Sequence, residues 1–264
     1  MTLPQGPFAA VLTGVTHRFR GEARDSLAGL DLAIERGTSV ALIGASGAGK
    51  STLMTLLDAR LRGWDGAAVV LDQALSPRQP LQRAQRADIG FVFQEFALIE
   101  RANVYRNVLN GRLGRTHVLQ SLIGRFSPAD HAAVEAALKD AGIADLAQKR
   151  ADQLSGGQRQ RVALARCLAQ EPKLILADEP VSNLDPVRAE AVLRVLSTAA
   201  RERGVSLIFS SHQPDLAAQF ADRIVALKDG KIAFDGAPDE LTQDQIAQIY
   251  AQDAQSEHHL RLVG

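Results

Sequence analysis

Short apolar runs separated by polar turns recur in the first and last thirds of the chain and predict a mixed α/β protein. Residues 8–19 and 27–35 are predicted as strands, and in the second of these Leu30, Leu32 and Ile34 alternate with polar positions. Short unbroken apolar runs are typical of buried strands. They occur at residues 40–43, 67–71, 89–93, 174–177 and 205–209.

Helical patterns lie between these runs. Residues 53–61 and 186–203 are predicted as helices, and the first is expected to end near Gly63. The pattern is also helical between residues 96 and 154, where Ser127-Pro128 is a typical helix start and Gly142 a typical end. The apolar face of that helix is expected to hold Ala132, Val134, Ala137 and Leu138. We therefore predict a helical insertion of about sixty residues in an α/β protein.

Composition excludes some classes of protein. Lys plus Arg and Asp plus Glu number 30 each in 264 residues, so no overall charge attracts the chain to nucleic acid or lipid. No apolar run approaches eighteen residues, so no membrane span is expected. The lone Cys167 lies among apolar residues and is predicted to be a small buried hydrophobe rather than a nucleophile.

The run at residues 40–43 leads into a glycine-rich segment, Gly44-Ala45-Ser46-Gly47-Ala48-Gly49-Lys50-Ser51-Thr52. It is a complete G-x-x-x-x-G-K-[ST] motif between a predicted strand and a predicted helix. Glycines let successive backbone N–H groups point into one concavity, and the helix N-terminus and Lys50 add positive charge. The Ser51 hydroxyl is expected to bind a magnesium ion that bridges the phosphates. The motif predicts a nucleoside triphosphate site; an ordinary glycine-rich turn is the alternative.

Two adjacent acids, Asp178 and Glu179, follow the apolar run at residues 174–177. Their side chains diverge at the strand end, so each can reach a different target. Beside a phosphate loop, Asp178 is expected to orient the magnesium shell and Glu179 to polarise the attacking water. A pair of solvated acids in a turn is the alternative.

The pentapeptide Leu154-Ser155-Gly156-Gly157-Gln158 predicts a second glycine-rich helix N-terminus. Ser155 and Gln158 have the spacing of a capping box, and the residues that follow continue a helix. This site lacks a lysine equivalent to Lys50, so it suits a weak anion site that completes the phosphate site of another molecule. A glycine-containing cap without further function is the alternative.

Four further positions are single residues with weaker signals. Gln94 and His212 each follow a predicted strand, where an amide and an imidazole are candidates to contact metal, water or γ-phosphate, although a structural role is the default. Asp185 precedes Pro186 and is first of all a helix N-cap. Phe19 is a candidate to stack on a base, although most such phenylalanines belong to the core.

Taken in order, these segments resemble the ATP-binding cassette (ABC) ATPases over nearly the whole chain. The resemblance implies a RecA-like P-loop core at residues 8–94 and 160–250, a small antiparallel β portion, a helical subdomain at about 95–159, and a polar tail at 251–264. One ABC ATPase domain over 8–250 is thus expected. ATP and Mg²⁺ are the implied ligands, and a head-to-tail dimer with a second copy of the chain is the implied assembly.

The resemblance also implies roles for individual residues. Glu179 becomes the general base, His212 the γ-phosphate partner, Asp178 the metal organiser and Asp185 a link across the dimer. Ser155 and Gly157 would contact the γ-phosphate bound by the other subunit. Ser51, Gln94 and Asp178 are the expected metal ligands, and Phe19 the expected base-stacking ring.

A narrower resemblance concerns the cargo. Residues 93–99, 107–114, 150–153 and 177–181 look like those of the ATPase subunits of phosphonate importers. It implies an import ATPase on the cytoplasmic face of the cell membrane, with membrane permease subunits, a substrate-binding protein as an indirect partner, and no nucleic-acid partner. The alternatives are an ABC ATPase for another cargo, such as a polar amino acid or lipoprotein, and a non-transport ABC ATPase.

Overall fold

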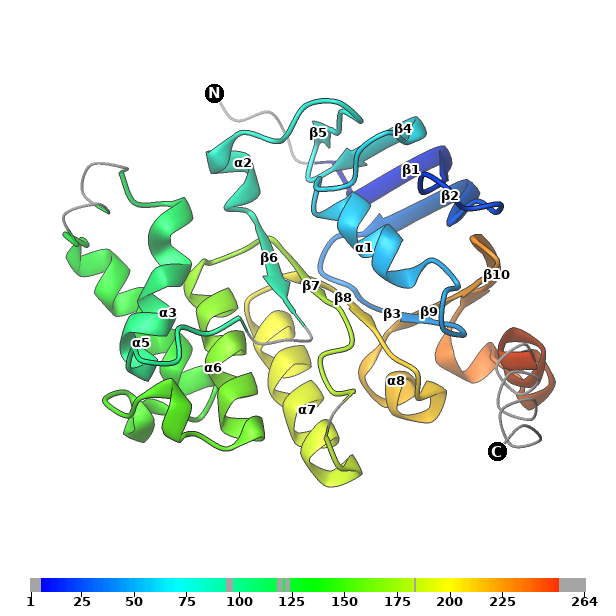
Figure 1. Ribbon diagram of the computed structural model, residues 1–264. Coiled ribbons are helices and arrows are strands. Elements are labelled where there is room, and N and C mark those ends of the chain that lie inside the picture. Colours follow the sequence, from blue (N-terminus) through cyan, green and yellow to red (C-terminus); the bar gives the residue numbers. More distant parts are fainter. Residues whose placement is uncertain (1–5, 94–96, 118–120, 122–123, 183, 252–264) are drawn as a thin grey trace. The chain divides into compact units, whose positions relative to one another are not determined.

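The computed structural model describes residues 6–93, 97–117, 121, 124–182 and 184–251 (Figure 1). Contacts between residues divide the chain into two compact units. Unit 1 consists of Met1–Pro80 and Ile208–Gly264, and unit 2 of Leu81–Leu207.

Unit 1 contains an antiparallel sheet in the strand order β2-β1-β4-β5. Its strands are β1 (Phe8–His17), β2 (Leu27–Glu35), β4 (Asp65–Val70) and β5 (Gln73–Ala74). Strand β2 has the predicted bounds, and the alternating residues Leu30, Leu32 and Ile34 are all buried. Polar residues alternate with them because one face of an antiparallel sheet can face water.

A second group of strands in unit 1 carries the phosphate loop. Strand β3 (Ser39–Ile43) is buried at every position and pairs in parallel with β9 (Arg223–Lys228), which pairs antiparallel with β10 (Lys231–Gly236). The hairpin turn has φ of 49° at Asp229 and 73° at Gly230, and an Asp-Gly pair adopts such positive φ values readily. Strand β8 (Ser206–Ser210) lies on the other side of β3 and enters unit 1 at Ile208.

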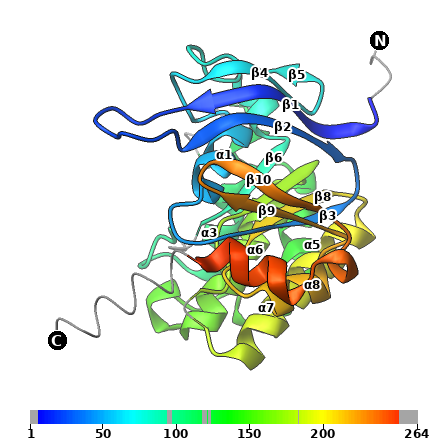
Figure 2. The same cartoon turned by 90° about the vertical axis from the view of Figure 1, so that its right-hand side faces the viewer.

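The helices of unit 1 are short. They are α1 (Lys50–Leu57), α8 (Pro214–Phe220), the 3-10 turn η4 (Pro238–Glu240) and a helix at residues 243–251, drawn in red in Figure 2. The predicted end of α1 near Gly63 is wrong. The helix stops at Leu57, because Ala59 turns into the left-handed region with φ of 56°.

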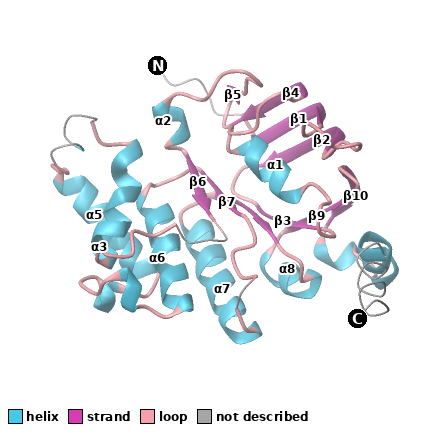
Figure 3. Ribbon diagram, viewed as in Figure 1, coloured by secondary structure: helices cyan, strands magenta, loops and turns pink. Residues whose placement is uncertain are grey.

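Unit 2 combines two parallel strands with most of the helices (Figure 3). Strand β6 (Ile89–Val92) pairs in register with β7 (Leu174–Ala177), as the apolar runs predict. The helices are α2 (Arg83–Arg86), α3 (Val104–Leu109), α5 (Pro128–Asp140), α6 (Gly156–Ala169) and α7 (Pro186–Glu202), with 3-10 turns η1 (Asn110–Gly114), η2 (Ala144–Leu146) and η3 (Ala151–Gln153). Helices α3, α5 and α6 pack against one another.

Helix α5 starts as predicted, with Ser127 as N-cap and Pro128 at the first turn, and it stops just before Gly142. Its expected apolar face needs one correction. Ala132 is exposed, whereas Val134, Ala137 and Leu138 are buried and Asp130 takes the remaining inward position. Two partners hold Asp130 there: its carboxylate accepts from the Ser127 N–H at 2.9 Å in a capping box, and it pairs with the buried Arg112 at 2.8 Å.

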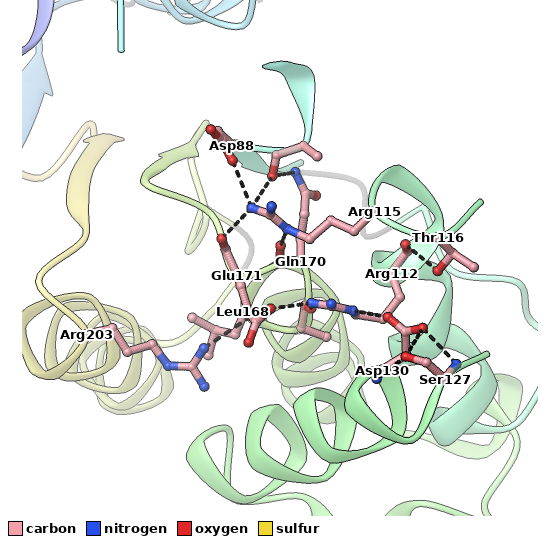
Figure 4. A network of polar contacts seen from close by, with 12 residues as sticks. Asp88, Arg112, Arg115, Thr116, Ser127, Asp130, Leu168, Gln170, Glu171 and Arg203 are labelled. Atoms are coloured by element: carbon pink, nitrogen blue, oxygen red, sulfur yellow. Dashed lines mark hydrogen bonds and ion pairs between the residues drawn. The ribbon is translucent and has the colours of Figure 1, made fainter. Parts of the chain in front are cut away.

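A buried ion pair joins η1 to α5, and its arginine also contacts the C-terminal end of α6 (Figure 4). Arg112 donates to Asp130 at 2.8 Å, and both side chains are less than one-tenth exposed. Arg112 also donates to the Ala169 carbonyl at 2.8 Å and to Glu171 at 2.7 Å. Burial raises the pKa of Asp130, but hydrogen bonds from Arg112 and Ser127 outweigh it and leave the pKa below its ordinary value.

Cys167 is buried on α6, as predicted, and burial raises the pKa of its thiol to about 12. The thiol is therefore protonated at neutral pH and is unsuited to act as a nucleophile. Among the described residues, we find no helix with the length and apolar character needed to cross a membrane.

Candidate functional site

The phosphate loop of unit 1 is shaped by glycines that have no space for a side chain. A Cβ atom at Gly44, where φ is 143°, would lie 2.3 Å from the Leu227 carbonyl oxygen. At Gly49, where φ is 106°, it would lie 2.4 Å from the Ser26 carbonyl oxygen. Both distances are far below van der Waals contact, so the backbone of the loop runs closer to its neighbours than any other residue permits.

Lys50 is 4% exposed, and its ammonium group folds back over the loop. It donates to the carbonyl oxygens of Gly44 at 2.6 Å and Ala45 at 2.9 Å. A buried ammonium group requires such partners, and the negative oxygens of a phosphate are stronger acceptors than carbonyls. The positive charge of Lys50 therefore lies within the loop that the motif predicts to hold phosphates. Ser51, the next residue, is exposed at the start of α1.

Phe19 follows strand β1 and His212 follows strand β8, and both residues belong to unit 1. Phe19 is 43% exposed and lies edge-on to His17, so the alternative of a core phenylalanine is wrong. Its loop returns to Ser26, whose carbonyl lies beside Gly49. His212 is exposed and follows Ser211, which donates to the Leu42 carbonyl at 3.0 Å two residues before the phosphate loop.

Asp178 and Glu179 follow β7 in unit 2. The Asp178 N–H donates to the Val92 carbonyl at 3.1 Å, which extends the pairing of β7 with β6 by one residue. Glu179 then has φ of 46°, a left-handed conformation that is uncommon for a residue with a side chain. Such strain is often found at functional sites. Both residues are half-buried.

The second predicted helix N-terminus is α6. Ser155 is its N-cap, and the capping box with Gln158 is present, with Ser155 N–H donating to Gln158 Oε1 at 3.0 Å. Cβ atoms at Gly156 and Gly157 would have no atom of the described residues within 4 Å. These glycines thus have room around them in the described part of the chain.

Two candidate residues, Asp185 and Gln94, remain. Asp185 is the N-cap of α7, as predicted, and its carboxylate accepts from the Arg188 N–H at 3.1 Å. Gln94 lies outside the described residues.

Sequence reasoning missed one contact of the phosphate loop. The Gly44 N–H donates to the hydroxyl of Tyr250 at 3.1 Å, across 206 residues of chain. Tyr250 belongs to no motif, and no local pattern in the sequence indicates this contact.

Comparison with known proteins agrees with this fold and these motifs. The family model described as ABC transporter matches residues 27–182. The chain therefore belongs to the ABC transporter family, and it is a P-loop ATPase of that family.

Two curated relatives and one solved structure are similar to this chain over more than four-fifths of its length. A protein of Halalkalibacterium halodurans named phosphonates import ATP-binding protein PhnC 2 is 43% identical over 84% of this chain and 91% of its own length. The hypophosphite import ATP-binding protein HtxD of Stutzerimonas stutzeri is 43% identical over 85% of this chain and 66% of its own. A dimeric ATP-binding cassette, MJ0796, solved in a post-hydrolysis state with ADP and Pi, is 30% identical, has a TM-score of 0.73, and matches 87% of this chain and 98% of that structure.

Proposed function

We propose that this chain is the ATP-hydrolysing subunit of an importer for phosphonates or related phosphorus oxyanions. The observation that carries the proposal is identity above 40% to importer subunits named for phosphonates and hypophosphite, over more than four-fifths of this chain. The intact phosphate loop, with its buried Lys50, supports ATP as the energy source.

ATP binds with its phosphates in the loop at Gly44 to Thr52. Lys50 exchanges its carbonyl partners for phosphate oxygens, and the backbone N–H groups of Ala45, Ser46, Gly47, Ala48 and Gly49 surround them. Phe19 stacks on the base, which its exposed ring permits.

Mg²⁺ is the proposed cofactor. The donor set of Ser51, Gln94 and Asp178 fits, because Mg²⁺ prefers oxygen ligands and is usually bound by few protein groups together with substrate phosphates. When bound, it neutralises charge on the phosphates. Ser51 is an exposed residue at the start of α1, as a ligand for a phosphate-bound ion must be.

Hydrolysis requires a positioned water. We assign Glu179 as the general base that accepts the water proton and His212 as the donor to the γ-phosphate. The strained backbone at Glu179 supports this assignment, because strain of this kind is often found where a side chain must be held in one direction.

The proposed dimer is based on the two glycines at the N-terminal end of α6. In the proposed head-to-tail dimer, Ser155, Gly156, Gly157 and Gln158 of one copy approach the γ-phosphate held by the other, and Asp185 links the copies. The dimeric state of the related cassette supports this arrangement. Permease subunits would bring the chain to the cytoplasmic face of the membrane as a peripheral protein, and a substrate-binding protein would deliver the cargo.

Growth of the source organism tests the cargo. Cells carrying Glu179→Gln are supplied with a phosphonate, hypophosphite or phosphate as sole phosphorus source. We expect growth on phosphate and failure on the phosphonate, on hypophosphite, or on both. Glu190→Gln is the matched control, since this exposed glutamate pairs only with Arg194 on the surface of α7 in the described part of the chain. Normal growth of Glu179→Gln cells on every source would contradict the proposed cargo.

A further inference from the structure

Both backbone polar groups of Gly44, the first glycine of the phosphate loop, have partners. Its carbonyl oxygen accepts from Lys50, and its N–H donates to the hydroxyl oxygen of Tyr250 at 3.1 Å. The two partners differ in whether they are expected to stay when ATP binds. Lys50 is the group that must leave to bind a phosphate, whereas Tyr250 contributes no charge and has no reason to leave. The Tyr250 bond is therefore a restraint on Gly44 that persists when ATP is bound.

The part of the C-terminal helix that carries Tyr250 is fixed to strand β9 (Figure 2). Lys228, the last residue of β9, donates to the Gln248 carbonyl at 2.7 Å, and Ile249 is 3% exposed. The preceding residue, Leu227, has the carbonyl oxygen that excludes any Cβ at Gly44. The end of β9 and the end of the helix thus confine the same glycine, one by close contact and the other by a hydrogen bond.

The hairpin beyond β9 supports the loop at another point. The Gly230 N–H donates to the Ala48 carbonyl at 3.2 Å. The C-terminal part of unit 1 therefore holds the phosphate loop both at its first residue and near its last, and Tyr250 is the side chain in that support that hydrogen-bonds directly to the loop backbone.

We propose that Tyr250 is a positioning residue for ATP binding. Its hydroxyl fixes the Ile43–Gly44 peptide and so sets the direction in which the loop leaves β3 toward the phosphates. This inference rests on the proposed role of the loop in binding ATP. Loss of the hydroxyl leaves the Gly44 N–H without its acceptor in a buried place, so the loop turns to satisfy it and presents its other N–H groups less well.

The test compares Tyr250→Phe with Thr242→Val in the full-length chain. Tyr250→Phe removes only the hydroxyl. Thr242→Val removes the side-chain cap at the far end of the same helix, where the Gln245 N–H donates to Thr242 Oγ1 at 3.3 Å, and it leaves Tyr250 in place. For each variant we measure the Kd of ATP with Mg²⁺, KM and kcat for ATP hydrolysis, and the thermal unfolding midpoint.

We expect Tyr250→Phe to raise the Kd and KM for ATP by about 3- to 10-fold, the effect of one lost hydrogen bond, with kcat within about 2-fold of wild type. Thr242→Val should lower the unfolding midpoint without raising KM. An unchanged KM in Tyr250→Phe, or an equal rise in both variants, overturns the inference. Lys50→Ala distinguishes failure of the phosphate-loop assignment from failure of the positioning role. If Lys50→Ala also leaves the Kd for ATP unchanged, the phosphate-loop assignment itself fails. If only Tyr250→Phe leaves it unchanged, the positioning role of Tyr250 alone fails.

Discussion

Helix α1 begins directly after a glycine and helix α6 begins with two glycines, and both N-termini are proposed to meet phosphate groups, but they are built in opposite ways. Two of the three glycines before α1 are crowded, with backbone carbonyls 2.3–2.4 Å from where a Cβ would lie at Gly44 and Gly49, whereas Gly47 has room for one. At the two glycines that start α6, no described atom would lie within 4 Å of a Cβ. Lys50 supplies a buried charge at the first helix, while Ser155 and Gln158 cap the second with neutral groups.

The difference shows how one motif type serves two tasks. A crowded loop with an internal cation is rigid before the ligand arrives, so little ordering is left to oppose binding. An open, neutral helix end attracts phosphate only through its N–H groups and dipole, which gives a weak site. Such a site suits the completion of a phosphate cage whose main part lies on another copy of the chain.

Removal of the cation should have the largest effect. Lys50→Ala should raise the Kd for ATP by about 10- to 100-fold, since a charge-assisted hydrogen bond is lost. Hydrolysis should fall by about 10³-fold, because the developing charge on the phosphates loses its stabilisation. Isothermal titration and phosphate release measure both, with Lys231→Ala on exposed β10 as the control. An affinity within twofold of wild type would remove Lys50 from the site.

Removal of the neutral Ser155 cap should lower ATP hydrolysis while leaving ATP binding by the monomer nearly unchanged. Ser155→Ala should lower hydrolysis by about 10²-fold, the usual cost of one missing donor to a charged transition state. The affinity of the monomer for ATP should stay within about 2-fold, because the serine acts on the partner's nucleotide. Equilibrium binding at low protein concentration and steady-state hydrolysis at high concentration distinguish these effects. If the monomer loses affinity in parallel with hydrolysis, Ser155 acts on its own nucleotide and the comparison fails.

Addition of a methyl group at each helix should move stability in different directions. Gly49→Ala should destabilise unit 1 by about 2–4 kcal/mol, since it forces a Cβ against the Ser26 carbonyl at positive φ. Gly157→Ala should be neutral or stabilise α6 by up to about 0.5 kcal/mol, since alanine favours helix and has room. Hydrolysis should nevertheless fall in Gly157→Ala, as the methyl group meets the partner's γ-phosphate. Thermal unfolding and phosphate release check the pair, and a Gly157→Ala enzyme with full activity would argue against the dimer site.

The buried ion pair of Asp130 on α5, whose partner Arg112 also contacts the C-terminal end of α6, should show the smallest effect, through pH. The pKa of Asp130 is below its ordinary value of 3.8, so its carboxylate contributes stability above that pH and loses it as pH falls through the lowered pKa. Asp130→Asn should therefore be less stable than wild type at pH 7, and the difference should shrink below about pH 4. Denaturant unfolding between pH 3 and 7 measures this. Asp140→Asn, at an exposed pair with Arg203, is the control; a pH-independent difference for Asp130→Asn would show that its charge is not responsible.

Local patterns in the sequence predicted most of the elements that carry the candidate site. The alternation at residues 27–35 matches β2, and the N-caps at Ser127, Ser155 and Asp185 are confirmed. These features depend on residues within a few positions of one another, so they are visible without a structure.

Features that depend on a single backbone conformation or on distant residues were not visible. The early end of α1 reflects a left-handed Ala59, which the apolar pattern up to Leu61 conceals. The inward position of Asp130 depends on Arg112 from another helix, and the support of Gly44 depends on Tyr250. Each of these contacts joins segments whose sequences carry no sign of one another.

The bond between Gly44 and Tyr250 also has a consequence for the order of events during synthesis. Because it spans 206 residues, it cannot form until Tyr250 has been translated. At about 5–20 residues per second, the glycine-rich segment waits roughly 10–40 s after its own synthesis for this partner. The nascent chain thus carries the full motif well before the support of its first glycine exists, and a product truncated ahead of Tyr250 would never acquire it.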